Sequence, residues 1–226
     1  LPTIGMLAVP LLALVMPPMQ AAVLLLPIYI LSDMVGIYLY RKAFSAQHLR
    51  ILIPAGLVGI GLGWATASRV SDAVLALMIG AVGIGFCLNT WLRKPATDGT
   101  PALRPLWGRF WGALSGFTSF ISHAGGPPFQ MYMLPQKLPK LVFAGTSTLF
   151  FAVVNMAKLV PYEFIRPYDV SSLRQAAWLV PFALLGTVMG AWLTRRLADA
   201  WFYRLVQIGL FFISIKLVWS ALPGLL

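Results

Sequence analysis

The chain has 226 residues, of which 59% are hydrophobic and only 10% are charged, against roughly 25% charged residues in an ordinary soluble domain. Its mean hydropathy is +0.83. This composition excludes a water-soluble enzyme, a disordered chain and a disulfide-stapled secreted module. The net charge is +11, but Lys and Arg stand in short groups between apolar runs rather than on one basic face. Cations that flank membrane spans explain this charge, so nucleic acid is not an expected partner.

Long apolar runs set the expected fold class. A helix that crosses a bilayer needs about 20 mostly apolar residues, and the sequence offers several such runs. It therefore predicts an all-α, polytopic helical membrane protein. The chain begins at Leu1 inside an apolar run, so further residues are expected before it. The expected helices cover residues 4–16, 20–40, 51–68, 73–92, 106–123, 128–135, 141–162, 175–194 and 205–222.

A polar linker, 94–105, divides the chain into two similar halves, 1–93 and 106–226, which we interpret as two membrane repeats. Four positions of the first half recur in the second at a constant offset of 127 residues. The matched positions are Pro54, Gly59, Gly63 and Asp72 in the first half and Pro181, Gly186, Gly190 and Asp199 in the second. The paired glycines also predict close helix approach in lipid.

The distribution of cations distinguishes two topologies. If 106–135 crosses the membrane as one kinked span, nine connector cations lie on one side of the membrane and six on the other. If it enters and returns as a hairpin, twelve lie on one side and three on the other. The second arrangement gives the clearer positive-inside bias. Its break would be Gly125-Gly126-Pro127-Pro128, and the first half would break near Pro10, with its return arm ending at Pro17-Pro18. Each repeat would then hold one broken or re-entrant helix plus three spanning helices, and the repeats would be inverted.

The hairpin topology also assigns the sides of the membrane. It places four connectors on the cytoplasmic side: Arg41–Arg50, Lys94–Arg109, Lys137–Lys140 and Arg195–Arg204.

The break in the second half is the first candidate binding site. Helix ends at Gly125, Gly126 and Phe129 would present free N–H groups and a positive dipole, which suit an anion. His123 would add a proton or a hydrogen bond. The alternative for His123 is a buried imidazole satisfied by neighbouring backbone.

The following helix, 141–162, carries polar residues on one face. Thr148, Asn155 and Tyr162 are seven residues apart, and Lys158 lies on the same side. A lysine in mid-membrane costs several kcal/mol unless it is paired or hydrated, so Lys158 is a candidate anion ligand; snorkelling to the helix end is the alternative. Thr146 and Ser147 begin the helix and would supply further hydroxyl groups.

Asp33 is the only acid inside a predicted span, with Tyr29 and Tyr40 on its face. It would couple proton movement or pair with Lys158. The chain contains no Walker A, HExxH or GxSxG motif, one cysteine (Cys87) and two histidines. No cofactor and no protein-built metal site are therefore expected.

The motifs of the second half resemble those of the TauE/SafE sulfite exporter family of permeases. They are Gly116-Phe117-x-Ser119-x-x-Ser122-His123-Ala124-Gly125-Gly126-Pro127-Pro128, Leu134-Pro135-Gln136, Leu138-Pro139-Lys140, Gly145-Thr146-Ser147 and Asn155-x-x-Lys158-x-x-Pro161-Tyr162. The resemblance implies an integral plasma-membrane carrier linked to sulfite, sulfonates and related organic anions.

We therefore expect a secondary transporter, not an enzyme, that exports sulfite or a short organosulfonate by alternating access. A passive anion channel is one alternative; an intramembrane enzyme using His123 and Asp33 as acid and base is another, although no positioned nucleophile or metal supports it. The expected partners are a small anion and the lipid bilayer, and small-residue helix faces permit a homodimer.

Overall fold

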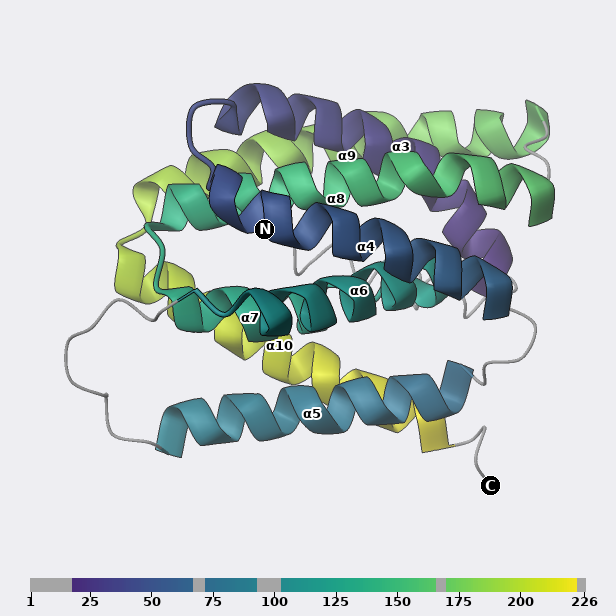
Figure 1. Cartoon of the computed structure of the whole chain (residues 1–226). Coiled ribbons are helices and arrows are strands. Elements are labelled where there is room, and N and C mark those ends of the chain that lie inside the picture. The colour runs from purple at the N-terminus through teal and green to yellow at the C-terminus, as the bar shows by residue number, and fades with distance from the viewer. Residues whose placement is uncertain (1–17, 67–71, 93–102, 166–169, 223–226) are drawn as a thin grey trace.

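The computed structural model describes residues 18–66, 72–92, 103–165 and 170–222, and all regular structure in these ranges is helical (Figure 1). The elements are α3 (Pro18–Tyr40), α4 (Ala46–Thr66), α5 (Asp72–Leu92), α6 (Pro105–Ser122), α7 (Gly126–Met133), the short 3-10 helix η1 (Leu134–Gln136), α8 (Lys140–Ile165), α9 (Val170–Arg196) and α10 (Asp199–Ala221). Among them, α3, α4, α8, α9 and α10 are long and apolar enough to cross a membrane. The prediction of a polytopic helical membrane protein is confirmed.

Some predictions fall on residues outside the described ranges. The expected helix 4–16, the first-half break near Pro10 and Pro17, and most of the linker 94–105 belong to this group.

Three helices begin five or six residues earlier than the hydropathy pattern predicts. We expected helices from residues 51, 175 and 205, but α4 begins at Ala46, α9 at Val170 and α10 at Asp199. The extra turns contain polar residues, such as His48, whose ring is buried and lies 2.7 Å from the Ser45 hydroxyl through Nδ1. Hydropathy marks the part of a helix that contacts lipid, whereas the helix itself continues into the interface.

Helices α4 and α6 cross at very short range. A Cβ atom on Gly59 would lie 1.9 Å from the Ala113 carbonyl oxygen, and one on Gly116 would lie 2.0 Å from that of Gly56. Only glycine permits this approach, so the expected packing role of Gly59 is confirmed. Gly186 does not have that role within the described residues, because nothing lies within 4 Å of its would-be Cβ.

Segment 105–136 folds back on itself. Near the start of α6, a Cβ on Gly108 would lie 2.8 Å from Cζ of Tyr132, which is near the end of α7. Further along, the Ser115 hydroxyl donates to the Gly125 carbonyl at 2.6 Å. Helix α7 therefore returns along α6 towards the end from which α6 started, as expected for a re-entrant hairpin rather than a kinked span.

Three of the four connectors that we grouped by charge, Arg41–Arg50, Lys137–Lys140 and Arg195–Arg204, meet at one end of the bundle, at the left of Figure 1. Lys140 before α8 pairs with Asp199 of α10 at 3.3 Å, and Arg195 of α9 donates to the Leu39 carbonyl of α3 at 2.9 Å. His48 Nε2 of α4 lies 3.5 Å from the Gln136 side-chain oxygen after α7. These three connectors therefore lie together at one end of the bundle.

Matching helices of the two halves run in opposite directions. Helices α3, α5 and α9 end at the shared end of the bundle, whereas α8, α10 and α4 begin there. Helix α3 packs against α8 and α9, and α8 packs in turn against α3 and α4, while α5 packs against α10. Two inverted repeats require this exchange of neighbours. The repeat boundaries 1–93 and 106–226 stay a prediction.

Candidate functional site

The helix break of the second half spans residues 123–125, between the end of α6 at Ser122 and the start of α7 at Gly126. His123 has a φ of 54°, a left-handed conformation that is strained for a residue with a side chain. Hydroxyl groups of α6 hold the break: Thr118 donates to the Ala124 carbonyl at 3.0 Å, and Ser115 donates to that of Gly125. These hydrogen bonds therefore hold the break in one defined conformation.

The depth of the break follows from its neighbour in α6. Gly125 lies against Ser115, which is ten residues after Pro105, where α6 begins. At about 1.5 Å per residue, the Gly125 end of the break is about 15 Å from the start of α6, whereas the His123 end, after the 18 residues of α6, is about 27 Å from it. The Gly125 end is therefore at about half of the roughly 30 Å hydrocarbon thickness.

Lys158 of α8 points into the break. Its side chain is 0% exposed, so it does not snorkel. The Nζ atom donates to the Ser119 carbonyl at 3.2 Å, to the Ser119 hydroxyl at 3.1 Å and lies 2.9 Å from Nδ1 of His123. These three contacts match the three donors of an ammonium group. All three partners are formally neutral.

The ion pair with Lys158, one of the two roles considered for Asp33, is not formed. Among the described residues, the one ion pair within 4.0 Å joins Lys140 to Asp199. Asp33 of α3 instead accepts a hydrogen bond of 2.7 Å from the amide of Asn155, which lies one turn before Lys158 on α8. The Asp33 carboxylate is thus hydrogen-bonded to the residue one turn before Lys158 and not to Lys158 itself.

His123 joins three helices. Its Nε2 lies 3.1 Å from the Ala22 carbonyl of α3, and a carbonyl only accepts, so Nε2 carries a hydrogen in this arrangement. Nδ1 lies between two groups, the Lys158 ammonium at 2.9 Å and the Ser119 carbonyl at 3.1 Å. It accepts from the first when unprotonated and donates to the second when protonated.

Two tyrosine rings enclose the imidazole of His123. Tyr29 of α3 meets it edge-on with centroids 5.1 Å apart, and Tyr162 of α8 stacks on it at 6.1 Å. The Tyr162 hydroxyl donates to the Phe120 carbonyl at 2.5 Å, so it satisfies an acceptor in the last turn of α6. These contacts place Tyr162 in the same cluster as His123 and Lys158.

The start of α7 provides fewer donors than the sequence pattern suggested. Gly126 is buried and begins the helix, but Pro127 and Pro128 follow it and have no N–H group. The Phe129 N–H donates to the Gly125 carbonyl at 3.2 Å. The Phe129 ring packs against Phe150 with centroids 5.1 Å apart. Phe129 therefore contributes to the hydrophobic core, and its N–H already has an acceptor.

The structure gives Thr146 and Thr148 hydrogen-bond partners outside the Lys158 cluster. Thr146 accepts from the Ser45 N–H at 2.9 Å and donates to the Val142 carbonyl at 2.6 Å, so it links α8 to the α3–α4 turn. It is twelve residues before Lys158, or about 18 Å along the helix. Thr148 donates to its own helix at Ala144. Ser147 is buried, and its hydroxyl has no partner.

Two buried polar residues, one in the Lys158 cluster and one in α7, were not among those selected from the sequence. Ser119 provides two of the three contacts of Lys158; its position four residues before His123 on one helix face was the available signal. Gln130 of α7 is 1% exposed, and both its amide nitrogen and its amide oxygen lack a partner. A lone amide in a short apolar helix was its only signal.

The family comparison covers both halves of the chain. The sequence model described as Sulfite exporter TauE/SafE matches residues 3–217, a range that includes the break and every residue of the cluster around it. Comparison with curated proteins and with solved structures found no match.

Proposed function

Because this chain belongs to the TauE/SafE sulfite exporter family, we propose that it exports a small oxyanion, either sulfite or a short organosulfonate, across the plasma membrane. The proposed mechanism is alternating access, in which one repeat moves against the other around a central anion. The proposed ligands are Lys158 and His123, with Asn155 one turn away on α8; Ser147, eleven residues before Lys158, would contact the anion elsewhere on its path.

The observation that carries this proposal is the fully buried Lys158 beside the broken helix. A cation in a low-dielectric interior is expensive unless a negative charge compensates it. Its three partners in the structure are neutral. An oxyanion that replaced one of them would keep a hydrogen bond and add an opposite charge, so binding is favoured by the same burial that makes the lysine costly.

Two further polar groups support an anion path along α7 and α8. The Gln130 amide and the Ser147 hydroxyl are both buried without partners. Unpaired polar atoms in a core cost about 1–3 kcal/mol each, and a passing oxyanion would accept hydrogen bonds from both. We propose that these groups contact the anion during transport.

Voltage and protons are the proposed driving forces. With the connectors Arg41–Arg50 and Arg195–Arg204 in the cytoplasm, an inside-negative potential favours anion exit by about 2.3 kcal/mol per charge per 100 mV. His123 Nδ1 faces a donor and an acceptor at once, so loss of the Lys158 contact to an anion would favour its protonation. We propose that His123 and Asp33 couple proton movement to transport in this way.

Proteoliposome flux assays test the proposal. Lys158→Gln should lower the flux of sulfite or a sulfonate by about tenfold or more, since a hydrogen bond to a charged group contributes about 1.5–3 kcal/mol. Lys216→Gln, which removes the other lysine placed within an apolar helix, α10, is the matched control and should transport normally. Unchanged flux in folded Lys158→Gln would refute the anion-binding role.

The same assay separates the alternatives. Saturable counterflow supports a carrier, currents far above carrier rates would indicate a channel, and chemical turnover of the anion without net flux would indicate an enzyme.

A further inference from the structure

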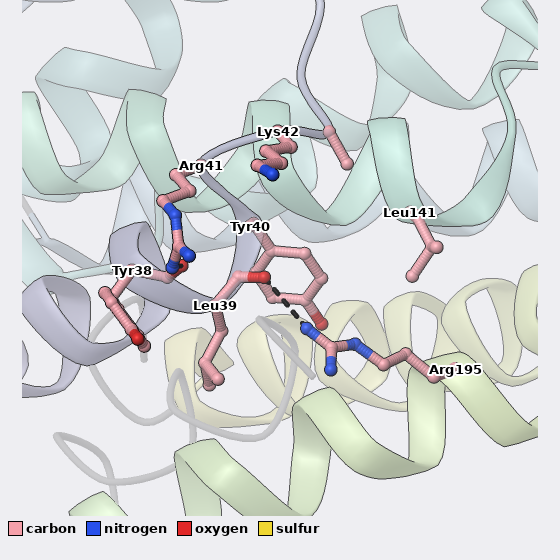
Figure 2. Close-up of a pocket in the computed structure, with 8 residues that line it drawn as sticks. Tyr38, Leu39, Tyr40, Arg41, Lys42, Leu141 and Arg195 are labelled. Atoms are coloured by element: carbon pink, nitrogen blue, oxygen red, sulfur yellow. Dashed lines mark hydrogen bonds between the residues drawn. The ribbon is translucent and has the colours of Figure 1, made fainter.

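A second polar site lies at the end of the bundle where α3 ends, α8 begins and α9 ends. It is a pocket of about 470 Å³, and Figure 2 shows its lining. The lining residues are Tyr38, Leu39, Tyr40, Arg41, Lys42, Ala43, Leu141 and Arg195. Leu141 precedes Lys158 by seventeen residues on α8, about 25 Å along the axis. This pocket is therefore separate from the helix break.

The pocket is cationic and has no acidic lining residue. Arg41, Lys42 and Arg195 all line it, and all three are exposed. Asp199, an acidic residue at this end of the bundle, pairs with Lys140 and does not line the pocket. Three positive charges thus face one volume without a carboxylate among them.

Hydrogen bonds to α3 position the two guanidinium groups and leave most of their donors available. Arg41 Nη1 donates to the Tyr38 carbonyl at 2.8 Å, and Arg195 Nη2 donates to the Leu39 carbonyl at 2.9 Å (Figure 2). Each bond uses one of the five donors of a guanidinium. Carbonyl groups at the end of α3, which have no partner within the helix, therefore orient two guanidinium groups. The planar guanidinium group is suited to bidentate hydrogen bonds with phosphate oxygens.

The surroundings of the pocket suit a ligand with apolar tails. Tyr38 is 65% exposed, and the Arg41 guanidinium lies 4.2 Å from its ring centroid, an arrangement typical of the membrane–water interface. Helix α9, which supplies Arg195, exposes apolar side chains such as Val188 at 48% and Trp192 at 58%. An apolar helix surface thus leads away from the cationic pocket, and acyl chains would lie along it.

We propose that this pocket binds the phosphate headgroup of an anionic phospholipid. Basic pockets between helix ends on the cytoplasmic side attract such lipids, at about 1 kcal/mol per Lys or Arg near the surface. Because the pocket joins α3 of the first half to α8 and α9 of the second, the lipid would hold the two halves together at this end.

Native mass spectrometry of the whole chain, released from micelles that contain phosphatidylglycerol or phosphatidylcholine, tests the proposal. The wild type should retain phosphatidylglycerol over phosphatidylcholine. The variant R41Q/K42Q/R195Q should lose that preference, by about fivefold for each cation removed. The matched control, R50Q/R109Q/R196Q, removes three exposed cations outside the pocket and should retain phosphatidylglycerol like the wild type.

Three results would overturn the assignment. Equal retention of phosphatidylglycerol by R41Q/K42Q/R195Q and the wild type would show that the pocket is not the site. An equal loss in the control variant would show a general charge effect. Equal retention of soluble glycerol phosphate by the wild type would show that the ligand is a free phosphate and not a lipid. R195K, which keeps the positive charge, should still retain phosphatidylglycerol. Its retention would show that the loss in the triple variant comes from the removed charge and not from loss of folding.

Discussion

Replacement of Gly125 by alanine tests whether the break is built as tightly as the structure indicates. A Cβ atom at this position would lie 2.6 Å from the Ser115 carbonyl oxygen, 2.8 Å from Cβ of Ser119 and 3.0 Å from a ring carbon of Phe151. Two of these three neighbours belong to α6, whose backbone cannot turn aside as a flexible side chain can. The start of α7 must therefore shift.

The size of the effect has two parts. Overpacking of a well-filled core costs about 1–3 kcal/mol. A shift of α7 would also stretch the 2.6 Å hydrogen bond from Ser115 to the Gly125 carbonyl, at about 0.5–1.5 kcal/mol. We expect Gly125→Ala to lower the free energy of unfolding by about 1.5–4.5 kcal/mol and to impair transport, because the Lys158 cluster is adjacent.

The assay is equilibrium unfolding in mixed micelles, combined with flux in proteoliposomes. Gly85→Ala in α5 is the matched control, since nothing lies within 4 Å of a Cβ there; alanine is the better helix former by about 1 kcal/mol, so this variant should not lose stability. A double-mutant cycle with Ser115→Ala should show coupling, because both substitutions disrupt the same hydrogen bond, from the Ser115 hydroxyl to the Gly125 carbonyl. If Gly125→Ala is as stable and active as Gly85→Ala, our description of the break is wrong.

Three other predictions address single groups of the site. Tyr162→Phe should destabilise the protein by about 1–3 kcal/mol in thermal or denaturant unfolding, because the Phe120 carbonyl loses its donor; unchanged stability would contradict this. Gln130→Leu should leave stability equal or higher, since its amide is unpaired, yet reduce anion flux; normal flux would remove Gln130 from the path. Asp33→Asn retains an acceptor for Asn155 and should fold normally but abolish the pH dependence of flux, so an unaltered pH profile would exclude Asp33 from proton coupling.

Much of the fold follows from local sequence. A bilayer demands apolar helices of defined length, so the class and the positions of most helices are visible in the hydropathy pattern. The run Gly125-Gly126-Pro127-Pro128 cannot continue a helix, because two consecutive residues have no N–H group. The counts of cations in the connectors then favoured a hairpin, and the contact between Gly108 and Tyr132 agrees with it.

The candidate site was only partly predictable. The sequence placed Lys158 and His123 near each other because a helix break and a following polar helix face suggest a pocket. It did not identify Ser119 as the main contact of Lys158, and it grouped Thr146 with residues about 18 Å away. Helical periodicity tells which residues share a face, but not how far along that face a neighbouring helix touches it.

The amino-acid sequence by itself determined that this chain is a helical membrane protein, where its second half breaks and to which family it is similar, because these properties depend on residues close together in the chain. Only the tertiary structure decided that Asp33 binds Asn155 rather than Lys158, and that Arg41 and Arg195 line one pocket. Those contacts join residues more than a hundred positions apart, and they depend on the rotation and depth at which helices pack, which no local pattern encodes.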